Sequence, residues 1–135
     1  MIRQIRSFTF LFLIMFLFGN TGYCFQKDTT VFLRVDSAPQ FKYKDSKSTK
    51  ECVDVFISEN IVWPNDADIY AKILVQCIVE LDGSLSNFKV IRSVEKTFDK
   101  ASIDVVKLMP KWTPGIKDSK KVRTQIIIPV VWKLI

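Results

Sequence analysis

The segment AKILVQCIVELDGSLSNFKVIRSV, residues 71–94, decides the fold of this chain. Apolar residues alternate with others over 71–81, as in a strand that buries one face. Asp82-Gly83 follows as a hairpin turn, because glycine adopts the positive φ that the turn requires. Residues 84–94 then return as a second strand. The first strand is expected to direct one set of side chains to the core, namely Ile73, Val75, Cys77 and Val79.

Two helices flank this hairpin in the sequence. The first helix is capped by Ser48 or Thr49 and ends before Pro64, because the residue before a proline avoids helical angles. Thr97 is expected to cap the second helix. A turn and a basic loop, residues 112–121, then lead to the last strand.

The last strand is expected over residues 122–135. Pro129 lacks the N–H that a ladder on both sides would require, so the strand belongs at a sheet edge. The run 126–131 is uncharged and β-prone, which makes it an aggregation hazard unless another segment covers it. One face carries Ile126, Ile128, Val130, Trp132 and Leu134, and the other carries Arg123, Gln125, Ile127, Val131 and Lys133.

These elements predict an α+β fold with a three-stranded antiparallel sheet, in the order 2-1-3, and two helices packed on one face. The hairpin pairs the first two strands, and the helical crossover that follows brings the third strand back beside the first. The third strand is then exposed at an edge, where an incoming extended peptide can pair with it. The first functional expectation is therefore a peptide-binding module.

The composition argues against several other classes of function. The chain has no histidine, so it offers no Ser–His or Cys–His pair and a poor zinc site, and it has no glycine-rich phosphate loop. We therefore expect no enzyme activity, no metal and no cofactor. The formal net charge is +6, but the lysines are scattered, which favours solvated loops over a nucleic-acid surface.

The first 24 residues are typical of a secretory signal peptide. Arg3 and Arg6 precede an apolar run over 8–18, and cleavage is expected after Cys24. The rest of the protein would then lie in the periplasm, with a connector over 25–38 and a folded domain over 39–135.

Two alternatives for the leader stay open. The uncharged span 7–26 is just long enough to cross a bilayer, so an uncleaved leader would anchor the protein in the inner membrane. Alternatively, Cys24 could become the lipid-modified first residue of a lipoprotein. All three interpretations place the domain outside the cytoplasm.

Cys52 and Cys77 are the two cysteines that remain after the leader. An even pair in an oxidising compartment could form a disulfide. Such a bridge would close a loop of about 25 residues and add roughly 3 kcal/mol of stability. Two small buried thiols are the alternative, and the sequence leaves both open.

An ordered set of segments resembles the TonB C-terminal domain family, in the versions found in Bacteroidetes-type bacteria. No single segment is specific, but their order is. The set consists of ILVQCIVELDGSLSNFKV at 73–90, FDKA at 98–101, MPKWTPG at 109–115 and IPV at 128–130.

This resemblance implies a periplasmic energy-transducing module that binds TonB-dependent outer-membrane transporters. A short extended segment of the transporter would pair with the last strand, so that backbone groups give affinity and side chains give selectivity. Inner-membrane motor proteins are further partners that the resemblance implies. Separately from the resemblance, a second copy of the chain could cover the exposed last strand. The partner-binding residues would be Arg123, Gln125, Ile127, Pro129, Val131 and Lys133.

The chain also departs from the family's usual pattern. The connector at 25–38 is too short to reach across a periplasm, since an extended chain gains only about 3.5 Å per residue. FKYK at 41–44 stands where the family usually has Pro-Gly-Gly, and Ala71 replaces a common glycine. A second function is therefore considered, a small secreted structural or inhibitory protein that uses the fold without a transporter.

Overall fold

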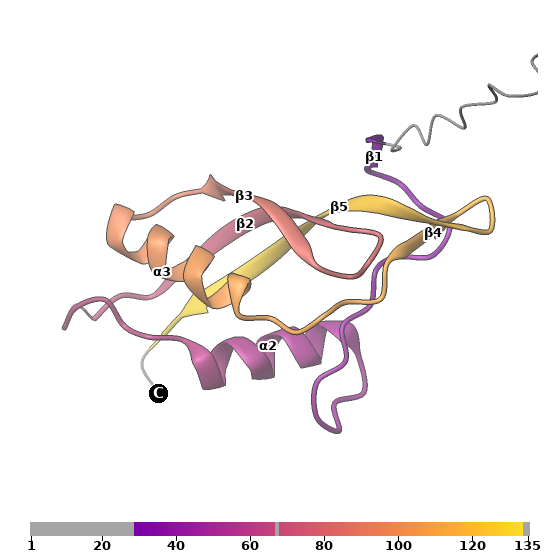
Figure 1. Ribbon diagram of the computed structural model, residues 1–135. Helices are drawn as coiled ribbons and strands as arrows, with labels where there is room; N and C mark the ends of the chain where they lie inside the picture. Colours follow the sequence, from indigo (N-terminus) through magenta and orange to yellow (C-terminus); the bar gives the residue numbers. More distant parts are fainter. Residues whose placement is uncertain (1–28, 67, 134–135) are drawn as a thin grey trace, which may run out of the picture.

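The computed structural model describes residues 29–66 and 68–133, and within them a curled mixed sheet is covered by two α-helices (Figure 1). The leader and the start of the connector lie outside these residues. The elements, in chain order, are β1 (Val31–Phe32), α2 (Thr49–Asn60), β2 (Ala71–Val79), β3 (Leu85–Arg92), α3 (Lys96–Lys107), β4 (Gly115–Lys117) and β5 (Lys120–Trp132).

The strand order is β1-β5-β2-β3, and β4 pairs separately with β5. β2 is antiparallel to both β3 and β5, which confirms the expected 2-1-3 order of the three long strands. The expectation of a purely antiparallel, three-stranded sheet was wrong. The connector contributes β1, which runs parallel to β5, and β4 lies where the expected turn and basic loop meet.

A tight turn explains why β4 forms. Asp118 and Ser119 both have positive φ, 51° and 62°, as a two-residue type I′ hairpin requires. This turn sets Lys117 opposite Lys120 and brings Gly115–Lys117 alongside β5.

The core lies between one face of the sheet and both helices. α3 packs against β2 and β3, while α2 packs against β5 and α3 (Figure 1). Trp63, Phe98 and Trp132 meet edge to face, with ring centroids 4.9–5.8 Å apart. The four β2 side chains expected in the core, Ile73, Val75, Cys77 and Val79, are all fully buried.

The helix ends agree in part with the sequence-based expectations. Ser48 is the N-cap of α2, and its hydroxyl accepts a hydrogen bond from the N–H of Glu51 at 3.2 Å. α2 ends at Asn60, before the proline expected to stop it. Thr97 was wrongly expected to cap α3. Glu95 holds the N-cap position, and the Thr97 hydroxyl instead donates to the Glu95 carboxylate at 3.0 Å.

Replacing Gly83 by alanine should lower the free energy of unfolding by about 1–3 kcal/mol. Gly83 has φ +85°, and a Cβ there would overlap the carbonyl oxygen of Trp112. That neighbour is held close, because the Trp112 N–H donates to the Gly83 oxygen at 2.8 Å. Urea denaturation would measure the loss. Asn87→Gly, at another left-handed position with φ 51°, is the control and should not destabilise. A Gly83→Ala variant as stable as the parent would contradict this account.

Candidate partner-binding edge

The direction of the backbone groups along β5 follows from the β2–β3 turn. The N–H of Glu80 donates to the oxygen of Ser84 at 2.8 Å, so even-numbered β2 residues direct their backbone groups toward β3 and odd-numbered ones toward β5. The odd-numbered residues of β2 pair with even-numbered residues of β5, as in Val75 with Ile128. Since paired residues exchange their hydrogen bonds, even-numbered β5 residues direct their backbone groups toward β2. Odd-numbered β5 residues direct theirs to the opposite side.

That opposite side is covered only at its start. β1 pairs with Arg123 and Thr124, and no other strand of the described ranges 29–66 and 68–133 pairs there. The stretch 125–131 is therefore an open edge, as expected for the last strand. Two of the predicted partner-binding residues fall outside this open edge. Arg123 pairs with Val31 of β1, and Lys133 lies just beyond the end of β5.

Pro129 fits this edge. It pairs with Leu74 of β2 on one side, and its odd number places the nitrogen on the open side. The missing N–H therefore costs the β2–β5 ladder nothing. The open edge thus offers the N–H groups of Gln125, Ile127 and Val131, and carbonyl groups at all four positions.

Apolar side chains surround the open edge on the face away from the helices. Ile127 is 50% exposed and Val131 is 38% exposed. An unpaired strand with exposed β-branched side chains is prone to pair with another chain. This edge is therefore the strongest candidate for a protein interface in the described part of the chain.

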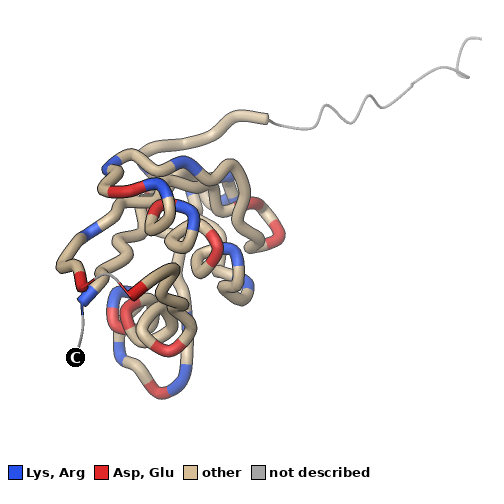
Figure 2. The backbone as a smooth tube through the Cα atoms, turned by 90° about the vertical axis from the view of Figure 1, so that its left-hand side faces the viewer, with Lys and Arg blue, Asp and Glu red and all other residues tan. Residues whose placement is uncertain are grey.

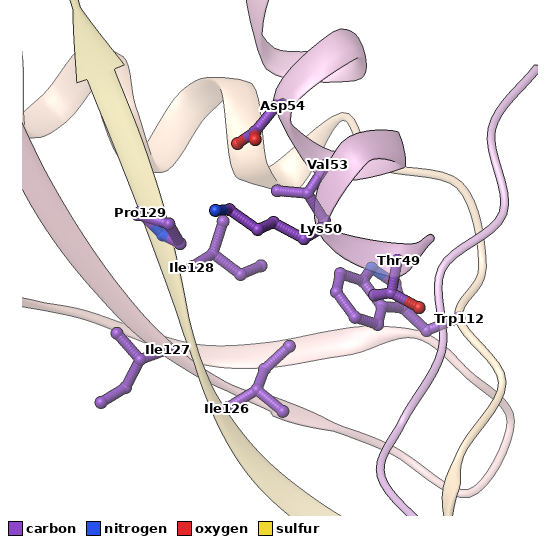
Figure 3. Close-up of a pocket in the computed structure, with 9 residues that line it drawn as sticks. All are labelled: Thr49, Lys50, Val53, Asp54, Trp112, Ile126, Ile127, Ile128 and Pro129. Atoms are coloured by element: carbon purple, nitrogen blue, oxygen red, sulfur yellow. The ribbon is translucent and has the colours of Figure 1, made fainter. Parts of the chain in front are cut away.

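An apolar groove lies beside the edge on the helix side, between α2 and β5 (Figure 3). Its volume is about 260 Å³. Ile126 and Ile128 point toward α2, whereas Ile127 points away from it. We call this the α2–β5 groove, and its lining consists of Thr49, Lys50, Val53, Asp54, Trp112, Ile126, Ile127, Ile128 and Pro129.

Trp112 lines the α2–β5 groove next to Thr49 (Figure 3). Its side chain is 7% exposed, and its ring stacks on Phe41 with the centroids 5.1 Å apart. Its indole N–H finds no hydrogen-bond partner among the described residues, although the nitrogen is buried. Buried donors without a partner are rare in native proteins, so this one calls for an explanation.

Residues 29–37, which we call the arm, include β1 and cover the start of the edge. Arg123 anchors this arm. Its guanidinium donates to both carboxylate oxygens of Glu80, at 2.7 and 2.9 Å, and to the backbone oxygen of Thr29 at 2.7 Å. The Lys117 ammonium also lies 4.9 Å from the centre of the Phe32 ring. These contacts hold β1 in place and set the position at which the open edge begins.

The two cysteines belong to the core and not to this edge. Cys52 and Cys77 are buried free thiols in the structure, so the bridge that the sequence left open is not formed in it. Burial raises the pKa of the Cys77 thiol to about 12. The thiol of Cys77 therefore stays protonated and unreactive at neutral pH.

In the part of the chain that the structure describes, charges of both signs are mixed along the backbone (Figure 2). Hydrogen bonds from Lys44 and Tyr43 lower the pKa of the Glu59 carboxyl. These three side chains form an exposed cluster on the surface.

Within residues 29–66 and 68–133, no group of three or more Cys, Asp or Glu side chains could hold a metal ion. In the same ranges, every helix is too short or too polar to span a bilayer.

Comparisons with known proteins place this geometry in context. Residues 65–134 match the family described as the Gram-negative bacterial TonB protein C-terminal. The solution structure of the TonB C-terminal domain of Helicobacter pylori is similar, with 22% sequence identity and a TM-score of 0.47. That match covers 62% of this chain and 78% of the other. The comparison with curated proteins found no match.

Proposed function

Since this chain belongs to the Gram-negative bacterial TonB C-terminal family, we propose that it is a periplasmic interaction module that supports energy-coupled transport across the outer membrane. In this proposal it binds an extended segment of a TonB-dependent transporter, which adds as a strand beside β5. The open edge at 125–131 is the single observation that carries the proposal.

The edge has the features that strand addition requires. Three N–H groups and four carbonyl groups face away from β2, so an extended segment could form a short ladder with them. Each such hydrogen bond contributes roughly 0.5–1.5 kcal/mol net, which suits a modest, reversible affinity. Ile127 and Val131 add apolar contacts on the face away from the helices.

The proposal is one of binding and not of catalysis. Within residues 29–66 and 68–133, the polar groups with shifted pKa values owe the shifts to surface or turn contacts. The pKa values of Lys44 and Glu59 shift because the two side chains hydrogen-bond each other, and that of Asp82 falls because Ser84 hydrogen-bonds to it in the hairpin turn. Each has a structural explanation away from the α2–β5 groove.

Export through the leader would bring the domain to the transporter. In the proposal, residues 1–24 act as a signal peptide and leave a periplasmic protein. An uncleaved leader would instead hold it at the inner membrane, beside the motor proteins that the family resemblance implies. The leader lies outside the described residues, so intact-mass analysis of the protein from fractionated cells is the direct test.

Amide hydrogen exchange tests the proposed binding mode. The protein is mixed with synthetic peptides that copy short segments of a TonB-dependent transporter from the same cells. We expect slower exchange at Gln125, Ile127 and Val131, whose N–H groups face the open edge, and little change at Ile126 and Ile128, whose N–H groups already bond to β2. Protection elsewhere with none at 125–131 would refute strand addition at β5. If the protein binds none of these peptides, that result would favour a secreted structural or inhibitory role.

A further inference from the structure

We propose that the α2–β5 groove is the selectivity pocket for the added strand, and that it takes one aliphatic side chain from the partner position opposite Ile128. The inference rests on the proposed function, because it needs a strand beside the open edge. It goes further in stating which side chain the partner must present and what surrounds it.

The geometry of a sheet places that side chain in the groove. Even-numbered β5 side chains point to the helices, as Ile126 and Ile128 do in Figure 3. A strand added to the open edge would alternate in the same way, so its side chains opposite these residues would also point to the helices. Beside β5, the space on that side is the groove against α2.

The lining of the groove selects an aliphatic side chain. Its inner surface is formed by Val53, Ile128 and the Trp112 ring, each less than 10% exposed. The volume of about 260 Å³ is several times the roughly 30 Å³ share of one water molecule, which leaves room for a leucine or isoleucine. The inner surface itself carries no charged group, so a carboxylate pressed against it would lose hydration there.

The rim of the groove is polar. Lys50 and Asp54 are exposed residues one turn apart on α2, and the Lys50 side chain extends across the groove toward β5 (Figure 3). Both signs of charge thus border the opening. Selection is therefore concentrated on the single inward-facing position, while its neighbours along the segment are free to be polar.

The indole N–H of Trp112 provides a spectroscopic reporter for the groove. The nitrogen is buried beside the groove and lacks a partner among the described residues. A bound segment would change its surroundings, so the Trp112 indole resonance reports directly on groove occupancy.

A second copy of this chain does not fit the groove as well as a foreign segment does. If β5 paired with β5, the inward side chains of each copy would be Ile126, Ile128 and Val130. Ile128 and Val130 are 2% and 0% exposed, because they already fill the core of their own protomer. They are not available to enter a partner's groove.

The chain's own arm does not fit the groove either. β1 pairs with Arg123 and Thr124 and then leaves this side of β5. The N–H groups of Asp36 and Ser37 both donate to the oxygen of Ile116 in β4, at 2.8 and 3.0 Å. The arm is thus bound to β4 and cannot reach the groove. A separate extended segment is therefore the occupant that the geometry favours.

The test compares two synthetic peptides on the protein isolated from cells that express the full chain. Both are capped heptapeptides of serine and threonine, with either leucine or aspartate at the central position. Binding is followed by ¹H–¹⁵N spectra of the amides at 125–131 and of the Trp112 indole, assigned with Trp112→Phe. We expect the leucine peptide to bind at least tenfold more tightly than the aspartate peptide and to shift the indole resonance.

A groove-filling variant separates this inference from the proposed function. Asp54→Trp should fill the groove from an exposed position and remove the preference for leucine. Ser58→Trp, one turn further along α2 and outside the groove lining, should keep it. Equal binding of both peptides at 125–131, unchanged by Asp54→Trp, would overturn the pocket and leave strand addition standing.

Two further outcomes have distinct meanings. If neither peptide perturbs residues 125–131, strand addition fails and the pocket fails with it. If the Trp112 indole shifts with protein concentration alone, a second copy fills the groove and the inference of a foreign segment is overturned.

Discussion

Replacing Ile127 by proline should lower the affinity for a transporter segment at least tenfold, about 1.4 kcal/mol, while the domain stays folded. The backbone groups of residue 127 face the open edge, so proline would remove a donor that β2 does not use. Its ring would also occupy the position where the added strand must approach. Isothermal titration with the segment, together with thermal unfolding, measures both quantities.

Ile128→Pro is the matched control, one residue away. The N–H of residue 128 faces β2, where residue 128 pairs with Val75, and its side chain is buried. Proline there would break the central ladder and unfold the domain. Ile127→Pro should therefore weaken binding and spare folding, whereas Ile128→Pro should disrupt folding. A bound segment that tolerates Ile127→Pro, or a fold that tolerates Ile128→Pro, would show that the edge has been assigned to the wrong side of β5.

Trp132→Ala should lower the free energy of unfolding by about 3–5 kcal/mol. Trp132 has no exposed surface and contacts Phe98 and Trp63 edge to face. Its indole N–H also donates to the Ser102 hydroxyl at 2.9 Å. Domains of this size are stable by roughly 5–15 kcal/mol in total, so the variant should be marginally folded. Denaturant unfolding is the measurement.

Trp132→Phe separates the two contributions of this side chain. It keeps an aromatic ring against Phe98 but removes the donor to Ser102, whose own hydroxyl still donates to the Phe98 oxygen at 2.7 Å. We expect it to be clearly less damaging than alanine. A loss below about 2 kcal/mol for Trp132→Ala would mean that the aromatic cluster is not the main support of this end of the core.

The three long strands and their order were predictable because their signals are local. Alternation over β2, the Asp82-Gly83 turn and the proline of the last strand each follow from a few neighbouring residues. β1 gave no such signal, since a two-residue strand has no periodicity and pairs Val31 with Arg123 at the far end of the chain. β4 was missed because its turn uses Asp118 and Ser119 with positive φ, without a glycine. An aspartate at a two-residue turn was the signal available.

The candidate site was likewise predictable only in part. The odd-numbered face of the last strand was predicted from alternation alone, and Gln125, Ile127, Pro129 and Val131 do lie along the open edge. The groove was not predicted, because it depends on where α2 docks against β5. Its polar rim and its tryptophan come from two segments far apart in the sequence. Only the packing of the whole domain brings Lys50 and Trp112 to the same strand.

The position of β5 also has a consequence for the timing of folding. β5 is the last described strand in sequence, yet it lies between β1 and β2 in the sheet. The ribosome adds about 5–20 residues per second, and until residue 132 has been added β1 has no neighbour and β2 has only its hairpin partner. Contacts so distant along the chain also slow folding. A growing chain therefore cannot complete this sheet before residue 132 has been added, and an incompletely folded polypeptide is one that can be threaded through a membrane pore.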